Sequence, residues 1–262
     1  MRSIAIVNQK GGSGKTTTTV NLAATLAEES KKVLVIDLDP QGAASLCYGF
    51  RDKGKDLYEV FTSEKPLREA ICKTEVENVE IVPSSYLVAG VEKVLANQPC
   101  SELLLKEKIL GIEDAFWDYV LLDCPPTLGI LSLNALAYAS EVLVPVETHV
   151  MALHGLVQLI RTINIVKQRL NPSLVISGIL PCRVDSRTKH AKEVICQLKD
   201  RFVGKILNTV IRENIKLAEA PLYKKPIISY DTKCNGAIDY RKLAKELISS
   251  ESESKELAAT SS

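Results

Sequence analysis

Residues 10–17 read Lys-Gly-Gly-Ser-Gly-Lys-Thr-Thr, a composition and spacing suited to binding phosphate. Glycines let backbone N–H groups approach phosphate oxygens without a Cβ in the way. Lys15 supplies charge for β- and γ-phosphates, and the hydroxyl of Thr16 suits Mg²⁺. The usual spacing G-x-x-x-x-G-K-S/T fails because Gln9 stands at its first glycine, and the dinucleotide pattern G-x-G-x-x-G lacks its third glycine. The segment matches instead a deviant form, K-G-G-x-G-K-S/T, which begins with an additional lysine, Lys10.

Three aspartates stand at or just after the ends of short apolar runs. Asp37 ends Lys-Val-Leu-Val-Ile-Asp, Asp39 follows it, and Asp123 ends Tyr-Val-Leu-Leu-Asp. One such aspartate alone would equally suit a helix cap or a turn. Ligands of open α/β sheets, however, bind outside the carboxyl ends of the strands. We therefore expect all three carboxylates to point toward the phosphate loop, with Asp123 holding Mg²⁺ directly or through water.

The elements that must position these residues alternate along the chain. Apolar, β-branched runs predict strands at 3–7, 32–37, 79–82, 119–123, 141–146 and 174–180. Apolar residues at helical spacing predict helices at 16–29, 87–96, 153–170, 189–202 and 237–248. Because the strands lack polar alternation, both of their faces are expected to be buried. We predict an α/β fold of the P-loop type, with a mostly parallel twisted sheet flanked by helices on both sides.

Composition supports one globular domain. The chain has 262 residues, of which 46% are hydrophobic and 25% charged. We predict a single P-loop domain over 1–249, with 49–66 as a surface excursion, and a disordered polar tail over 250–262. The seven cysteines form no C-x-x-C pair, which is typical of reduced thiols and gives no zinc or iron–sulfur ligand set. No run approaches the ~18 apolar residues of a membrane span.

Four motifs, taken in order and spacing, resemble the ParA/Soj family of partition ATPases. They are Asn8 to Thr19, Asp37-Leu38-Asp39-Pro40-Gln41-Gly42, Asp123-Cys124-Pro125-Pro126 and Leu217-Ala218-Glu219-Ala220-Pro221. The resemblance extends from about residue 4 to residue 248. It implies an ATPase of the deviant Walker A type with weak intrinsic turnover, and ATP and Mg²⁺ as its cofactors.

The resemblance also implies roles for individual residues. Lys10 is similar to the signature lysine, which crosses a nucleotide-sandwich dimer to the partner's phosphates. Lys15 resembles the lysine on the β- and γ-phosphates, and Asp39 the residue that positions the attacking water; these three are the implied catalytic residues. The implied nucleotide-binding residues are Lys10, Gly11, Gly12, Ser13, Gly14, Lys15, Thr16, Thr17 and Asn214. The implied metal-site residues are Thr16, Asp37 and Asp123.

Two places depart from the family pattern. The family commonly has Ile-Pro-Arg-Asn, and this chain keeps Asn214, the implied adenine contact, but has Arg212 and Glu213 in place of the Pro-Arg pair. The rest of the adenine pocket therefore differs. His149 and His154 stand where family members often have Glu, and we expect them to be surface or helix-face histidines.

Charge is unevenly distributed in a chain whose net charge is +1. Residues 182–245 contain fifteen Lys or Arg and seven Asp or Glu, a net charge of +8. This asymmetry predicts a positive surface for a polyanion, although solvated helix faces give similar runs of charge. Family contacts to non-specific duplex DNA come from this half, and the resemblance implies Arg187 and Lys216 as DNA-binding residues.

The resemblance implies a partition switch that dimerises on ATP and binds DNA without sequence preference. A ParB-like centromere-binding protein would stimulate hydrolysis and release, so that chromosome or plasmid DNA is segregated. Such a homodimer would be cytoplasmic and nucleoid-associated, with no membrane contact. The alternatives are a ParA-like ATPase for a non-DNA cargo, a metabolic enzyme on the same core, and a MinD-like membrane-cycling ATPase. The last needs a basic amphipathic C-terminal helix, whereas the tail Ser-Glu-Ser-Glu-Ser-Lys-Glu is not basic.

Overall fold

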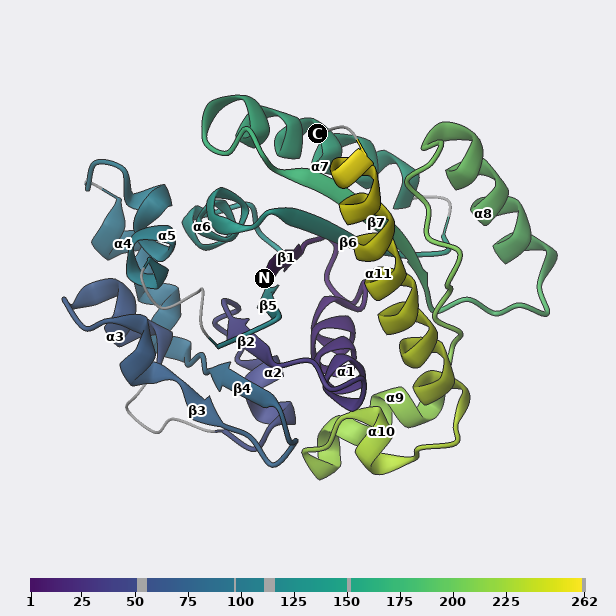
Figure 1. Ribbon diagram of the computed structural model, residues 1–262, viewed down its shortest axis with the longest axis horizontal. Helices are drawn as coiled ribbons and strands as arrows, with labels where there is room; N and C mark the ends of the chain where they lie inside the picture. The colour runs from purple at the N-terminus through teal and green to yellow at the C-terminus, as the bar shows by residue number, and fades with distance from the viewer. Residues whose placement is uncertain (51–55, 97, 111–115, 150–151, 261–262) are drawn as a thin grey trace.

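A seven-stranded sheet forms the centre of the protein (Figure 1). The computed structural model describes residues 1–50, 56–96, 98–110, 116–149 and 152–260. The strands are β1 (Arg2–Ile6), β2 (Val33–Asp37), β3 (Cys72–Lys73), β4 (Val79–Val82), β5 (Tyr119–Asp123), β6 (Glu141–Glu147) and β7 (Val175–Cys182). Their order is β3-β4-β2-β5-β1-β6-β7, and every neighbouring pair is parallel except β3 and β4. The predicted α/β class and mostly parallel sheet are confirmed.

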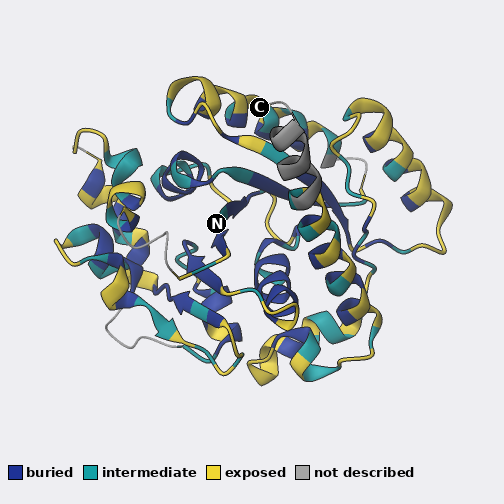
Figure 2. Ribbon diagram, viewed as in Figure 1, coloured by how far each residue is buried: buried dark blue, intermediate teal, exposed yellow. Residues whose placement is uncertain are grey.

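Alternate side chains of the strands enter two hydrophobic cores, one on each face of the sheet. In β1, Ile4 and Ile6 belong to one core and Ala5 to the other. All five residues of β2 and of β5 are buried. A strand covered on both faces needs apolar residues at every position, which explains the missing polar alternation. Figure 2 shows the buried sheet between helices that expose their outer sides.

Helices cover both faces, as predicted. One core receives α1 (Lys15–Glu28), α2 (Ala43–Cys47), α10 (Ile227–Tyr230) and α11 (Asn235–Thr260). The other receives α3 (Leu57–Thr62), α4 (Val91–Leu95), α5 (Leu104–Ile109), α6 (Ile130–Tyr138), α7 (Ala152–Arg169) and α8 (Lys189–Arg201). The short α9 (Ile215–Glu219) precedes α10. In the described part of the chain, no helix has the length and apolarity to cross a membrane.

The segments that connect the main elements differ from the sequence expectations. The helix expected at 87–96 is a 3₁₀ helix, Tyr86–Gly90, followed by the single turn of α4. The surface excursion expected at 49–66 contains α3, whose Leu57 and Phe61 are buried in the core. Asp56 caps this helix by accepting the N–H groups of residues 58 and 59, so a short amphipathic turn packs inward. Residues 51–55 of this stretch lie outside the described residues.

The last helix extends beyond the expected domain end. The sequence predicts a helix at 237–248 and a disordered tail from 250, whereas α11 continues to Thr260. The additional residues include Glu, Lys, Leu and Ala, which have high intrinsic helix propensity. Residues 261–262 of the predicted tail lie outside the described residues. His149 and His154, on either side of the start of α7, are exposed as expected.

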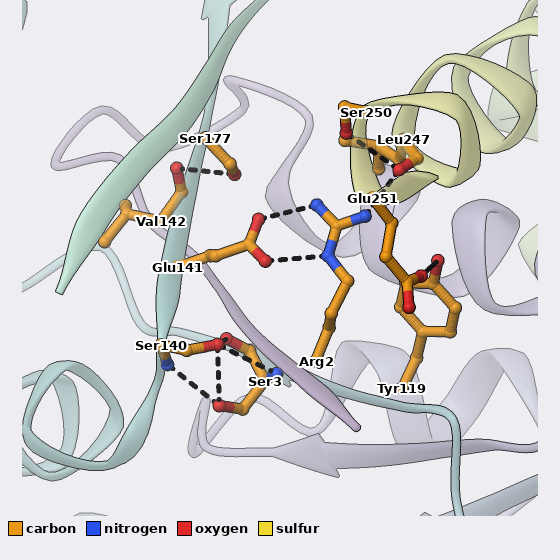
Figure 3. A network of polar contacts seen from close by, with 10 residues as sticks. All are labelled: Arg2, Ser3, Tyr119, Ser140, Glu141, Val142, Ser177, Leu247, Ser250 and Glu251. Carbon is orange, nitrogen blue, oxygen red and sulfur yellow. Dashed lines mark hydrogen bonds and ion pairs between the residues drawn. The ribbon is translucent and has the colours of Figure 1, made fainter. Parts of the chain in front are cut away.

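Arg2 joins three strands and the last helix at the amino ends of the strands (Figure 3). Its Nε and Nη2 donate to the two carboxylate oxygens of Glu141, each at 2.7 Å, and its Nη1 donates to the carbonyl oxygen of Leu247. The guanidinium lies 5.6 Å from the ring centroid of Tyr119, whose hydroxyl contacts Glu251 at 3.0 Å. A bidentate arginine–carboxylate pair fixes geometry as well as charge, so this network helps to dock α11.

Replacing Glu141 with alanine should lower the free energy of unfolding by about 2–3 kcal/mol, because the partly buried Arg2 would lose its carboxylate. Both side chains are only 13% exposed, so water cannot fully replace the lost partner. Glu141→Gln retains one hydrogen-bond acceptor and should cost about half as much. Urea unfolding followed by circular dichroism measures both variants. A Glu141→Ala midpoint equal to that of the wild type would contradict the docking role.

Candidate functional site: a phosphate loop at the carboxyl edge of the sheet

The phosphate loop connects β1 to α1 and has glycine at two points where the backbone requires it. Gly12 has a φ of 77° and Gly14 a φ of 93°, both in the left-handed region that other residues rarely adopt. Gly14 is the N-cap of α1, so the first N–H groups of that helix face the loop. Asn8 anchors the start of the loop, because its Nδ2 donates to the carbonyl oxygen of Pro145 in β6 at 2.6 Å.

The two lysines of the loop occupy different environments. Lys15 is 7% exposed, and its Nζ donates to the carbonyl oxygen of Lys10 at 3.3 Å. Burial lowers the pKa of Lys15, and the charges of Asp123 and Asp39 act in the opposite direction. The side chain of Lys10 is 50% exposed, and its ammonium pairs with Glu147. One lysine therefore points into the site, and the other lies at the surface.

Asp123 is buried at the end of β5, beside the first turns of α1. Its Oδ1 accepts the hydroxyl of Thr19 at 3.1 Å. Burial and then the charge of Asp37 raise the pKa of Asp123, while the hydroxyls of Thr16 and Thr19 lower it. The structure thus brings Thr16, Asp37 and Asp123 together, as the metal-site prediction requires. A divalent cation beside them would offset the cost of burying these carboxylates.

Asp37 is fixed by hydrogen bonds, whereas Asp39 is partly exposed. Asp37 is the residue opposite Asp123 in the register of β2 and β5. Its Oδ2 accepts the N–H and the hydroxyl of Ser45 at 2.8 and 2.6 Å. Burial raises the pKa of Asp37, and the bonds from Ser45 oppose that shift. Asp39 accepts the N–H of Gln41 at 3.0 Å, which forms the turn that follows β2.

Two buried polar atoms of this site lack a hydrogen-bond partner among the described residues. They are the hydroxyl oxygen of Ser13 and Oδ2 of Asp123. Buried polar atoms in folded proteins are nearly always satisfied, so such atoms point to a ligand. The hydroxyl lies in the glycine-rich loop, and the carboxylate is an oxygen ligand of the kind that Mg²⁺ prefers. The residues present fit a phosphate-bearing ligand with a divalent cation.

A cavity of about 580 Å³ extends from the phosphate loop to residues 211–215. Asn214 lines it and caps α9, because its Oδ1 accepts the N–H of Lys216 at 2.9 Å. Arg212 also lines the cavity, but its guanidinium is held by Asp239 at 2.6 Å. The volume lies in the range of small-molecule sites. The cavity thus gives the phosphate site a neighbouring space large enough for a base and a sugar.

The predicted DNA-binding residues lie on two adjacent segments. Arg187 stands in the loop between β7 and α8, and Lys216 in α9; backbone hydrogen bonds join the segments that precede them. Each side chain pairs with an acidic neighbour. Arg187 contacts Asp185 at 2.9 Å, and Lys216 contacts Glu219 at 3.1 Å. Both cations are therefore at the surface and partly neutralised by their own chain.

Three further residues of the site were not predicted. Thr19 holds Asp123, Ser45 holds Asp37, and Glu147 pairs with Lys10. Thr19 carries a weak signal, since it lies one helical turn after Lys15. Glu147 carries a stronger one, because it ends a strand in the same way as Asp37 and Asp123. Ser45 carries none, since only the turn after β2 brings its hydroxyl back to the sheet.

Comparison with known proteins extends the likeness to nearly the whole chain. Residues 1–176 match the family described as AAA domain. The chromosome-partitioning ATPase Soj of Treponema pallidum is 41% identical over 247 residues, covering 94% of this chain and 97% of that protein. The sporulation initiation inhibitor protein Soj of Bacillus subtilis is 42% identical over 246 residues, covering 93% of this chain and 97% of that protein.

A solved structure shares both the fold and part of the sequence. Cobyrinic acid a,c-diamide synthase from Mycobacterium smegmatis, with bound ADP and magnesium, is 34% identical with a TM-score of 0.83, covering 95% of this chain and 94% of that chain. The curated relatives carry the family assignment, because their identity exceeds 40% over almost their full length. This chain belongs to the ParA/Soj family of partitioning ATPases, as its motifs predict.

Proposed function

We propose that the protein is an ATP-driven partition switch that dimerises on ATP, binds duplex DNA without sequence preference, and hydrolyses ATP to return to the free state. The observation that carries this proposal is that the two lysines of the loop differ in their burial and direction. Lys15 is buried toward the carboxylates, whereas Lys10 lies at the surface. Because the ammonium of Lys10 lies at the surface and not in the buried part of the site, it is available to a nucleotide held by a second subunit.

Nucleotide binding is assigned to the loop and the adjoining cavity. The N–H groups of Gly11, Gly12, Ser13 and Gly14 and the N-terminus of α1 face the phosphates, and Lys15 neutralises their charge. Thr16, Asp37 and Asp123 would hold Mg²⁺, which would supply positive charge beside the phosphates. Thr17 and Asn214, which both line the cavity, contact the α-phosphate and the adenine respectively. Asp39 orients the water that attacks the γ-phosphate.

Dimerisation is assigned to the exposed side of the loop. Gly11 and Gly12 are exposed, and a Cβ at either position would meet nothing within 4 Å. A second subunit can therefore approach the backbone closely, and Lys10 can reach its phosphates. Because each dimer presents two DNA-binding faces, dimerisation raises the affinity for DNA through multivalency. A ParB-like partner stimulates hydrolysis, and the switch acts on the nucleoid in the cytoplasm.

Binding to random-sequence duplex DNA, measured with ATP, ADP and no nucleotide over a salt series, tests this proposal. We expect binding with ATP only, equal affinity for unrelated sequences, and a steep loss of affinity as salt increases. Sedimentation under the same conditions should show the dimer with ATP only. ATP-dependent dimerisation without DNA binding in any nucleotide state would refute the DNA step and favour a protein cargo.

Replacing Arg187 or Lys216 with alanine should weaken DNA binding several-fold and lower the salt slope by about one per lost phosphate contact. The loss should be the same for unrelated DNA sequences, because phosphate contacts carry no sequence information. Lys167→Ala, which removes an exposed lysine from α7, is the matched control and should leave the slope unchanged. An unaltered slope in both test variants would place the DNA-binding face elsewhere.

A further inference from the structure

Glu147, the last residue of β6, holds Lys10 within its own chain. Lys10 Nζ pairs with Oε2 of Glu147, and Nη1 of Arg183 donates to Oε1 at 2.8 Å. The side chain of Lys10 is 50% exposed, but that of Glu147 is only 14% exposed. The carboxylate is therefore seated in the fold, while the ammonium that it holds lies at the surface.

The strand order creates this pairing. Because β6 lies directly beside β1, the start of the phosphate loop runs along the end of β6. The side chain of Asn8 stabilises that arrangement by bonding both to β6 and to the phosphate loop. Its Nδ2 donates to Pro145 at 2.6 Å, and its Oδ1 accepts the N–H of Lys10 at 3.0 Å. The backbone of Lys10 is thus anchored to β6, and its half-exposed side chain lies between Glu147 and solvent.

The two cations beside Glu147 keep its carboxylate ionised, and both of them pair with it. Burial acts to raise its pKa, but the hydrogen bonds and charges of Lys10 and Arg183 outweigh that effect, so the pKa lies below its usual value. Arg183 also approaches Glu213 at 3.7 Å, on the wall of the cavity beside the phosphate loop. When Lys10 leaves, Glu147 keeps Arg183 as a partner, so the departure does not leave the partly buried carboxylate without a counter-charge.

We propose that Glu147 is a positioning residue that retains Lys10 in the free subunit and must release it before Lys10 can reach the phosphates of a second subunit. This inference rests on the proposed function, in which Lys10 acts across an ATP-dependent dimer. The retained pair competes with dimerisation, because Lys10 cannot contact its own Glu147 and the partner's phosphates at once. Each dimer must break two such pairs.

Glu147→Gln tests the proposal by removing the charge while keeping the size of the side chain. With a non-hydrolysable ATP analogue, we expect the dimer dissociation constant to fall on the order of 5- to 30-fold, since two partly exposed ion pairs no longer oppose association. Analytical ultracentrifugation measures the constant. Glu59→Gln, in α3, breaks a surface pair with Lys65, a lysine about as exposed as Lys10, and is the control. It should change the constant less than 2-fold.

Two further measurements separate positioning from a merely structural role. The affinity of the dilute monomer for the analogue should stay within about 2-fold in Glu147→Gln, because Glu147 holds Lys10 and not the nucleotide. In a Lys10→Gln background, Glu147→Gln should no longer tighten the dimer, as a double-mutant cycle requires. A Glu147→Gln dimer that is as weak as the wild type or weaker would overturn this inference. A wild-type protein that stays monomeric with the analogue would overturn the proposed function itself.

Discussion

Lys15→Gln should weaken ATP binding by about 100-fold or more while the protein keeps its fold. Lys15 is 7% exposed and faces the buried carboxylates of the site. Water is largely excluded there, so the attraction between its ammonium and a phosphate is much stronger than at the surface. Removing one preorganised donor from a water-excluded catalytic site lowers the rate about 10²- to 10³-fold, and we expect a loss of affinity of similar order where the donor is charged. Glutamine retains a hydrogen-bond donor but not the charge.

Calorimetric titration with ATP and Mg²⁺ measures this effect, and Lys167→Gln is its control, since that lysine is exposed on α7, which packs into a different core from α1. Urea unfolding separates lost binding from lost folding. Burial lowers the pKa of Lys15, which means that the charged form is poorly solvated there. Removing the charge should therefore leave the apo protein at least as stable as the wild type. ATP affinity within 3-fold of the wild type would refute the phosphate-loop assignment.

The sheet and the loop were predictable because their signals are local. Runs such as Tyr119–Asp123 contain only apolar residues before the final aspartate, which identifies a strand buried on both faces. The position of Gly14 before a helical segment identifies the loop, since φ near 93° suits glycine. The rule that ligands bind at the carboxyl ends of parallel strands then places Asp37 and Asp123 together, and their register confirms it.

Short and terminal elements were harder to predict. The helix α3 has only six residues, too few for a clear helical period. Its burial depends on packing into the core that also receives α4 to α8. The tail after residue 249 has a disordered-like composition but good helix formers. A helix already in place at Tyr240 and Leu247 can be extended without a new nucleation cost, which composition alone does not reveal.

The supporting contacts of the site depend on tertiary structure. Ser45 reaches Asp37 only because the turn after β2 reverses the chain, and Ser84 N–H completes the link at 2.8 Å to the Ser45 hydroxyl. Glu147 meets Lys10 only because β6 is the neighbour of β1. Strand order in a parallel sheet is not encoded in any single segment, so pairs of this kind follow from the structure and not from the motif.

Asp39→Ala should still bind ATP, dimerise and remain on DNA, but its turnover should fall about 10²- to 10⁴-fold, the usual contribution of a positioned acid–base group. Asp39 lies at the carboxyl end of β2, and its side chain is partly exposed beside the loop. Since hydrolysis is the proposed step that ends the DNA-bound state, the lifetime of the DNA complex should increase. Phosphate release and dissociation from immobilised DNA measure the two effects in one preparation.

Asp39→Asn separates the chemical role of this residue from its role in the turn. The Oδ1 of Asp39 accepts the N–H of Gln41 at 3.0 Å, and an asparagine oxygen can do the same. An amide cannot carry the negative charge that orients and polarises a water molecule. If Asp39 acts on water, Asp39→Asn should lose turnover as Asp39→Ala does, while its unfolding midpoint stays close to that of the wild type. Normal turnover in Asp39→Asn would assign the residue to the turn alone, and the water-positioning group would have to be sought elsewhere at the edge of the sheet.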